Sequence, residues 1–164
     1  MLSTILSLAA CTAIVSAQQP PNLTAALAST PELSQLTTLL SSNQQLVQAL
    51  GRAQNITILA PSNEALAKLN ASGAASALLD PAVVQATLQY HVLNGTYPSS
   101  AITETPAFVP TLLENRVFEN VTGGQVVEVL KKGEDVLVYS GLLSNASVTK
   151  ADTNFTGGVI HIIE

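Results

Sequence analysis

Cysteine is almost missing from this sequence: the single one, Cys11, lies in an apolar stretch at the start of the 164-residue chain. If that stretch is removed as a leader, the remaining chain has no thiol. This excludes disulfides, thiolate metal sites, cysteine nucleophiles and thiol redox chemistry. A secreted domain of this composition must therefore be held together by its core.

Charged and aromatic residues are also scarce. Charged residues make up 10% of the chain and aromatic residues 4%, and tryptophan is absent. The formal net charge of −5 argues against binding to nucleic acid or to an anionic membrane surface through bulk electrostatics. The low aromatic content argues against a platform on which bases or sugars stack. We therefore expect no nucleic-acid partner.

The first 17 residues have the pattern of a cleaved signal peptide. Residues 2–15 form a short apolar run, and Val15-Ser16-Ala17 fits the small-residue rule for cleavage. Only the amino terminus supplies the positive charge that usually precedes such a run. Because the run is too short to span a bilayer, we expect cleavage and a short tail over residues 18–21. The mature chain is then extracellular and does not insert into the membrane.

Apolar side chains are what the sequence has in abundance, and they make up 47% of it. That fraction is too high for a disordered chain, and 164 residues are enough to enclose one core. No internal repeat or linker divides the sequence after its leader. We therefore expect a single domain over residues 22–164, monomeric by default.

Asparagine sequons are the second abundant feature, with seven N-x-S/T sites after the leader and no proline at any middle position. Single sequons arise by chance, but this number behind a signal peptide indicates adaptation to N-glycosylation. Glycans would supply the solvation that the sparse charge does not. We expect Asn55 and Asn154 to be poorly accessible, because they adjoin apolar strands. The candidate glycosylation sites are Asn22, Asn55, Asn70, Asn94, Asn120, Asn145 and Asn154.

The centre of the predicted fold is a strand that runs directly into a capped helix. The segment Ile56–Leu59 is apolar, and Pro61 ends it because proline cannot donate a ladder hydrogen bond. Ser62 then offers its hydroxyl to the first amides of a helix, with Glu64 in the first turn. A second strand, Val159–Ile163, is apolar on both faces in the same way. Both strands therefore belong in the middle of a sheet.

Helical patterns fill the rest of the N-terminal half and strand patterns the rest of the C-terminal half. Leucine and valine recur at helical spacing over residues 33–50, where Gly51 is the predicted C-cap, and again after the Asp80-Pro81 start signal. Short strands are predicted over residues 125–130, 135–139 and 147–152, with a hairpin turn over 131–134. This order indicates an α+β fold with helices packed on one side of an antiparallel or mixed sheet.

Three short motifs make the chain similar to fasciclin-type domains. Thr57–Leu66 resembles the family's first signature box, Tyr90-His91-Val92-Leu93 its tyrosine–histidine motif, and Gly158–Glu164 its second box. They occur in the family's order and at its spacing. The resemblance implies a β-wedge, two small sheets meeting at an angle beside several helices, with the two boxes paired as central strands. Family members usually continue into a closing strand, so we expect this domain to be truncated before its last strand.

The resemblance also implies a function in cell adhesion or in the extracellular matrix, without enzymatic activity. The family's implicated surface falls on Tyr90 and His91 with flanking Leu88, Val92 and Leu93, although these residues can instead be core. The partners would be extracellular proteins or glycans, bound weakly and multivalently at the cell surface or in the matrix. An alternative is a structural protein of the cell wall or matrix whose glycan coat matters more than any protein surface.

The two histidines of the mature chain, His91 and His161, are the remaining candidates for chemistry. Two imidazoles without a third ligand do not make a zinc site. A hydrolase that uses one of them with a nearby acid such as Asp152 is an alternative, but no serine on a strained turn accompanies them. We expect both imidazoles to hydrogen-bond to the backbone, and we expect no catalytic residue, metal or cofactor.

Overall fold

The structure is a computed structural model that describes residues 19–73, 80–113, 125–140 and 145–164. Within these residues the chain forms helices first and then mostly strands, in the predicted order. The leader and the sequon at Asn120 lie outside them.

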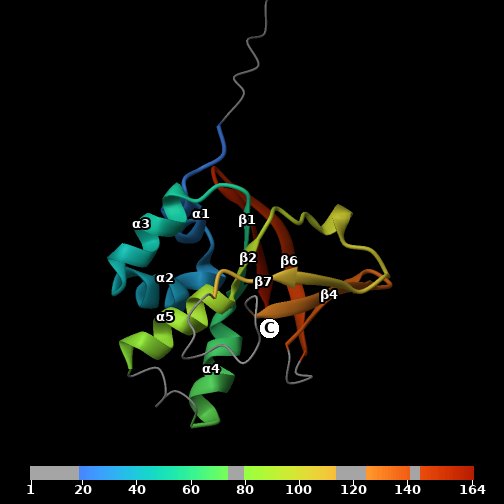
Figure 1. Ribbon diagram of the computed structural model, residues 1–164. Helices are drawn as coiled ribbons and strands as arrows, with labels where there is room; N and C mark the ends of the chain where they lie inside the picture. Colours follow the sequence, from blue (N-terminus) through green and yellow to red (C-terminus); the bar gives the residue numbers. More distant parts are fainter. Residues whose placement is uncertain (1–18, 74–79, 114–124, 141–144) are drawn as a thin grey trace, which may run out of the picture.

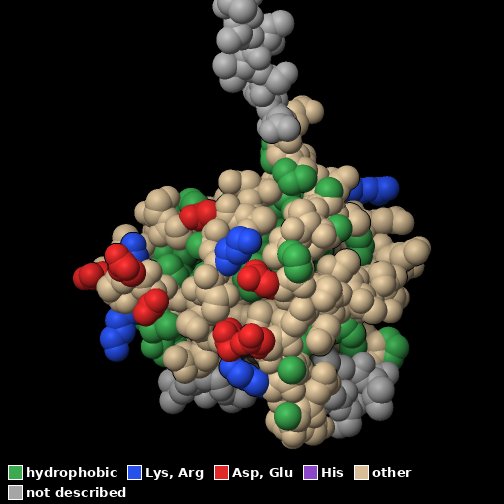
Figure 2. Space-filling view, turned by 180° about the vertical axis from the view of Figure 1, so that it is seen from behind, with side chains coloured by type: hydrophobic (Ala, Val, Ile, Leu, Met, Phe, Trp, Pro, Cys, Tyr) green, Lys and Arg blue, Asp and Glu red, His purple; other side chains and the backbone are tan. Residues whose placement is uncertain are grey.

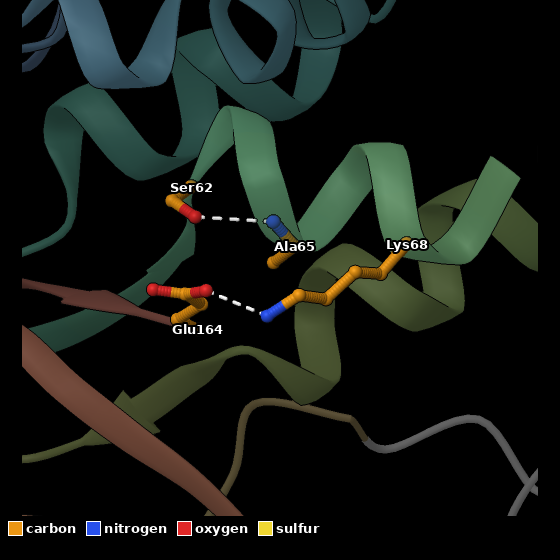
Figure 3. Close-up of polar contacts among 4 residues, drawn as sticks. All are labelled: Ser62, Ala65, Lys68 and Glu164. Carbon is orange, nitrogen blue, oxygen red and sulfur yellow. Dashed lines mark hydrogen bonds and ion pairs between the residues drawn. The ribbon is translucent and has the colours of Figure 1, made fainter. Parts of the chain in front are cut away.

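Helices make up most of the N-terminal half, and two of them begin at the predicted caps. The Ser62 hydroxyl accepts a hydrogen bond from the Ala65 amide at 3.1 Å, at the start of α4 (Asn63–Ala71) (Figure 3). Asp80 caps α5 (Pro81–Tyr90) in the same way. The other helical segments are α1 (Leu23–Ala28), η1 (Pro31–Leu33), α2 (Ser34–Ser41), α3 (Gln44–Arg52) and η3 (Ser99–Ala101).

Seven strands form one mixed sheet in the order β2-β1-β7-β6-β5-β4-β3. The predicted pairing of the two signature boxes is confirmed, because β1 and β7 lie side by side in parallel, with Leu59 opposite His161. All other neighbouring strands run antiparallel. The strands are β1 (Ile56–Pro61), β2 (Val92–Asn94), β3 (Ala107–Pro110), β4 (Val126–Lys132), β5 (Asp135–Tyr139), β6 (Asn145–Phe155) and β7 (Gly158–Ile163).

Strand β6 belongs to two parts of this sheet. It pairs with β5 at its start and with β7 along most of its length, where its register shifts between Val148 and Lys150 and again between Lys150 and Thr153. An isolated bridge from Leu93 to Thr111 joins the far end of the sheet back to β2. Such irregularities bend a strand, so the arrangement is compatible with the expected wedge.

Two boundaries differ from the predicted ones. Gly51 lies inside α3 rather than after it, because the helix continues to Arg52 and Ala53 is its C-cap. Strand β6 is eleven residues long, whereas the sequence pattern predicted residues 147–152 only. Three of its five extra residues, Asn145, Thr153 and Asn154, are polar, so pairing with two neighbours rather than apolar alternation defines its ends.

The core is divided between the two faces of the central strands. Alternate residues of β1, Ile56, Ile58 and Ala60, pack with the helices, whereas Leu59 packs in a second cluster among β3, β4 and β5. The helices gather on one side of the central strands β1 and β7, and strands β3–β5 lie on the other (Figure 1). This explains why both boxes are apolar on both faces, and it confirms the α+β class.

Candidate functional site

The tyrosine–histidine motif lies where α5 ends and β2 begins. His91 is the C-cap of α5, and its Nδ1 lies 2.7 Å from the Thr87 carbonyl oxygen. The His91 carbonyl in turn accepts a hydrogen bond from the Leu59 amide at 2.8 Å. The rings of Tyr90 and His91 meet edge to face, with centroids 6.0 Å apart. The motif therefore fastens the end of α5 to the central strand β1.

The five residues of the predicted contact surface do not share one environment. Val92 and Leu93 are each 1% exposed, so they are part of the core and have no area to offer a partner. Leu88 is half-buried against the helix-side cluster, and Tyr90 is half-buried against the cluster on the other face. Only Leu88, Tyr90 and His91 reach the surface, and we call these three the Tyr90 surface.

The electrostatic state of His91 follows from its surroundings. Burial lowers the pKa of His91, and the hydrogen bond to the Thr87 carbonyl opposes this effect without cancelling it. The imidazole is therefore neutral near pH 7. Because Nδ1 faces a carbonyl oxygen, it must carry the proton and donate, which makes Nε2 an acceptor. Among the described residues, no donor bonds to that Nε2.

Both ring nitrogens of His161 hydrogen-bond to the backbone, as predicted. It is 1% exposed, its Nδ1 accepts from the Asp152 amide at 3.3 Å, and its Nε2 lies 2.7 Å from the Tyr97 carbonyl oxygen, to which it donates. Both nitrogens thus have hydrogen-bond partners. Neither nitrogen can take a proton from a nucleophile unless its hydrogen bond to the backbone is broken. The geometry gives His161 a role in joining β6, β7 and the loop after β2.

Asp152 lies near His161, as the sequence predicted, but its carboxylate binds elsewhere. The Ser99 amide donates to one carboxylate oxygen at 2.8 Å and the Ser99 hydroxyl donates to the other. Partial burial raises the pKa of Asp152, but these hydrogen bonds outweigh that effect and lower it. Ser99 therefore contacts the acid directly, without a histidine between them, so these three residues do not have the arrangement of a catalytic triad.

All six described sequon asparagines are exposed. The expectation that Asn55 and Asn154 are poorly accessible is wrong. Asn55 precedes β1 in a left-handed turn with φ 60°, and its Oδ1 accepts from the Thr96 amide at 3.0 Å. Asn154 lies on β6, where neighbouring side chains alternate between the two faces, and it is on the face toward solvent.

The surface is short of charge as well as rich in sequons. Figure 2 shows a face that is mostly uncharged, with a few acidic and basic side chains scattered over it. In the described ranges, no group of three or more His, Cys, Asp or Glu residues could hold a metal ion. None of the described helices is long and apolar enough to cross a membrane.

Comparison with known proteins finds the same family over most of the chain. A model of the fasciclin domain family matches residues 31–164. The chain is 30% identical to a fasciclin-like arabinogalactan protein of Arthroderma benhamiae over 137 residues, and 32% identical to the fasciclin-like arabinogalactan protein elcF of Phaeosphaeria nodorum over 142 residues. It is also 30% identical to human periostin over 119 residues.

These alignments cover 82%, 87% and 73% of this chain, but 32%, 45% and 12% of the respective relatives. Among solved structures, a FAS1 domain pair from the insect cell adhesion molecule fasciclin I has a TM-score of 0.64 and 26% identity. That match covers 81% of this chain and 44% of the other. The chain therefore spans less than half the length of these proteins.

Proposed function

Because the chain belongs to the fasciclin domain family, we propose that it is a secreted, N-glycosylated module of cell adhesion or of the extracellular matrix, without enzymatic activity. The family match over residues 31–164 carries this proposal. A structural neighbour is itself described as a cell adhesion molecule. The occupied nitrogens of His161 and the Ser99–Asp152 pair also argue against the alternative of a hydrolase based on His161.

The positions of the sequons support secretion and glycosylation. Six sequon asparagines lie exposed over several parts of the fold, including Asn22 before α1, Asn70 in α4 and Asn154 in β6. A chain with 10% charged residues has few other groups to keep its surface solvated. Glycans at these positions would hold neighbouring molecules apart, which favours weak contacts that gain strength by multivalency.

We assign the protein-binding role to the Tyr90 surface. Tyr90 offers a ring with a polar hydroxyl, beside the neutral imidazole of His91 and the half-exposed Leu88. An amphipathic aromatic side chain of this kind is typical of protein interfaces.

A variant series tests this assignment in a cell-attachment assay on surfaces coated with the protein. We expect Tyr90→Ala to lower attachment at least tenfold, while Tyr90→Phe keeps most of it. Phe108→Ala is the matched control, because Phe108 is an aromatic residue on β3 that is 70% exposed. Thermal unfolding shows whether each variant is folded. Equal attachment by folded Tyr90→Ala, or an equal loss in Phe108→Ala, would overturn the assignment.

A structural, glycan-coated protein of the wall or matrix is the second candidate. Two relatives are named arabinogalactan proteins, and the exposed sequons would carry such a coat here too. Enzymatic removal of N-glycans distinguishes the two functions. Attachment that persists after sugar removal supports the protein surface, and attachment that disappears from a folded protein supports the glycan coat.

Expression behind its own leader in a eukaryotic host tests secretion. We expect the mature protein in the medium to begin at Gln18 and to lose mass on treatment with an N-glycosidase. Retention of the leader, or a mass equal to that of the bare chain, would contradict this part of the proposal.

A further inference from the structure

One face of strands β3, β4 and β5 carries the most exposed large apolar side chains of the described residues. Phe108 on β3 is 70% exposed and Val126 on β4 is 42% exposed. Their neighbours Val109 and Val127 are buried in the second cluster, so these two side chains are on the opposite face of their strands. We call it the outer face, formed by Phe108, Val126, Glu128, Leu130, Leu137 and Tyr139.

The outer face lies away from the helices (Figure 1). In the sheet, β5 and β6 separate its central strand β4 from β7. It also has no residue in common with the Tyr90 surface. It is therefore a second candidate for contact with a partner, independent of the first.

Three side chains of the outer face stand in one row across the strands. Phe108 lies opposite Glu128, and Glu128 lies opposite Tyr139. Because neighbouring strands are about 4.8 Å apart, the two aromatic residues are roughly 10 Å from each other, with the carboxylate side chain between them. A cation above that carboxylate would be about 5 Å from each aromatic residue, within the range of a cation–π contact.

The Glu128 carboxylate has no counter-charge. In the part of the chain that the structure describes, no hydrogen bond or ion pair involves its side chain. Lys132 and Asp135, which follow on the same side of the strands, lie opposite each other, so their charges offset one another. The face of an aromatic ring also carries partial negative charge. The row of Phe108, Glu128 and Tyr139 therefore attracts a cation.

Apolar side chains flank the carboxylate along β4. Val126 and Leu130 are two residues before and after Glu128, so they lie on the same face, about 6.7 Å away on each side. Leu137 lies opposite Leu130 and enlarges the apolar area. An extended chain repeats its side chains at the same interval. A segment laid along β4 can thus match these three residues with an apolar, a basic and a second apolar side chain.

The charge of this face argues against a second copy of the chain as its occupant. A two-fold interface brings the same surface of both chains together, so the two Glu128 carboxylates would approach each other without a counter-charge. Arginine fits the row better than lysine does. Its planar guanidinium stacks on aromatic rings and can form two parallel hydrogen bonds to one carboxylate.

We propose that the outer face binds an extended segment of a partner protein, in which an arginine stands between two apolar residues, each two positions away from it. The guanidinium lies on Glu128, between Phe108 and Tyr139. This binding goes beyond the proposed adhesion and does not rest on it. Phe108→Ala should weaken the binding of this segment and leave cell attachment through the Tyr90 surface unchanged.

A capped peptide, Thr-Val-Thr-Arg-Thr-Val-Thr, is the probe, and NMR titration of the intact protein measures its affinity. We expect saturable binding with a dissociation constant on the order of 1 mM, because the site is exposed and the peptide is short. Citrulline in place of arginine keeps the shape but removes the charge, and it should weaken binding about tenfold. A peptide with both valines next to the arginine should also bind more weakly. Absence of saturation, or equal affinity of the citrulline peptide, would overturn the proposal.

Two substitutions in the row locate the site. Glu128→Gln and Phe108→Leu should each weaken the arginine peptide about threefold, since each removes one contact with the cation. Both should leave the citrulline peptide nearly unchanged. Glu134→Gln is the matched control, because Glu134 is exposed in the turn between β4 and β5 and its loss changes the net charge equally. An equal loss in the control would show attraction by net charge alone and refute the site.

Ring-current shifts in the unmodified protein do not depend on how the variants fold. The ring signals of Phe108 and Tyr139 should move on titration, and the arginine side-chain protons of the peptide should move upfield, because they lie over ring faces. The ring of Tyr97, which packs against the second cluster, should keep its signals. The reverse pattern would contradict the site. Self-association of the free protein that is lost in Phe108→Leu would assign this face to a second copy and overturn the proposal.

Discussion

Two of the most deeply buried polar side chains, Thr57 and His161, hydrogen-bond to the backbone of a segment that is distant in the sequence. Thr57 is fully buried, and its hydroxyl donates to the Gly95 carbonyl at 2.8 Å and accepts from the Tyr97 amide at 2.9 Å. His161 holds the Tyr97 carbonyl from β7. The polar groups of these two side chains thus have partners, which avoids the cost of an unsatisfied donor or acceptor. Without a disulfide, these contacts fix the loop after β2.

The Ser99–Asp152 pair gives a first prediction at this scale. Asp152 has φ 59° and holds two groups of Ser99, so Asp152→Ala should lower the free energy of unfolding by about 2 kcal/mol. Asp152→Asn should lower it by less, because asparagine tolerates this backbone conformation and can still accept. Chemical denaturation measures both, with Asp135→Ala as an exposed control that should stay within about 0.5 kcal/mol.

Acidification provides a further check on the same carboxylate. The pKa of this carboxylate is lowered in the folded state. Its contribution to the free energy of unfolding is therefore complete above the ordinary pKa of 3.8 and is lost as the pH falls through the pKa of the folded state. The stability difference between the wild type and Asp152→Asn should therefore shrink below pH 3.8. A difference that stays constant with pH would argue against the ionised pair.

His91 gives the second prediction, with a pH dependence at a higher range. Its pKa is lowered by burial, so below 6.5 the unfolded chain binds a proton that the folded protein does not. Between 6.5 and the folded value, the free energy of unfolding should fall by up to about 1.4 kcal/mol per pH unit of acidification. Denaturation of the wild type and His91→Asn between pH 5 and 8 measures this, and the variant should lack the excess slope. Equal slopes would show that His91 does not titrate in this way.

At the scale of elements, the parallel contact of β1 and β7 determines where the two signature boxes lie. A Cβ atom at Gly158 would overlap the carbonyl oxygen of Ile56, the residue opposite it, and φ at Gly158 is 155°. Gly51 is different, because it lies in α3 with nothing within 4 Å of an added Cβ. Gly158 therefore allows the backbones of β1 and β7 to approach closely, whereas no contact requires a glycine at position 51.

Alanine at these glycines gives the third prediction. Gly158→Ala should lower the free energy of unfolding by about 3 kcal/mol or more, because β1 must move away from β7. Gly51→Ala should raise it by about 0.5–1 kcal/mol, because alanine loses less conformational entropy in a helix. Thermal and chemical denaturation of both variants measure the difference. If the two changes had the same sign, the strand contact would not be as tight as described.

At the scale of the whole molecule, a sparse set of charges and a broad set of sequons share the surface. The fourth prediction is that the enzymatically deglycosylated protein remains folded but becomes less soluble, since few charges then keep molecules apart. Light scattering against concentration should show earlier association after treatment than after mock treatment, while the unfolding temperature changes little. Equal solubility of the two samples would mean that the charge present is sufficient.

The sequence by itself determined the central elements of this protein. The sequence predicts strands at Ile56–Leu59 and Val159–Ile163 and a helix capped by Ser62, and all three are present, because apolar runs, prolines and capping residues act on their nearest neighbours along the chain. The resemblance then supplied their pairing, and the two faces of each strand are apolar because two clusters cover them.

Only the tertiary structure decided which of the candidate residues belong to the core and which reach the surface. Val92 and Leu93 are part of the core, and the Asp152 carboxylate accepts a hydrogen bond from the amide of Ser99, 53 residues away in the sequence. The length of β6 likewise depends on its pairing with β5 and with β7. A sequence pattern reports the environment along one element, whereas these features arise from contacts between elements that the chain brings together only when it folds.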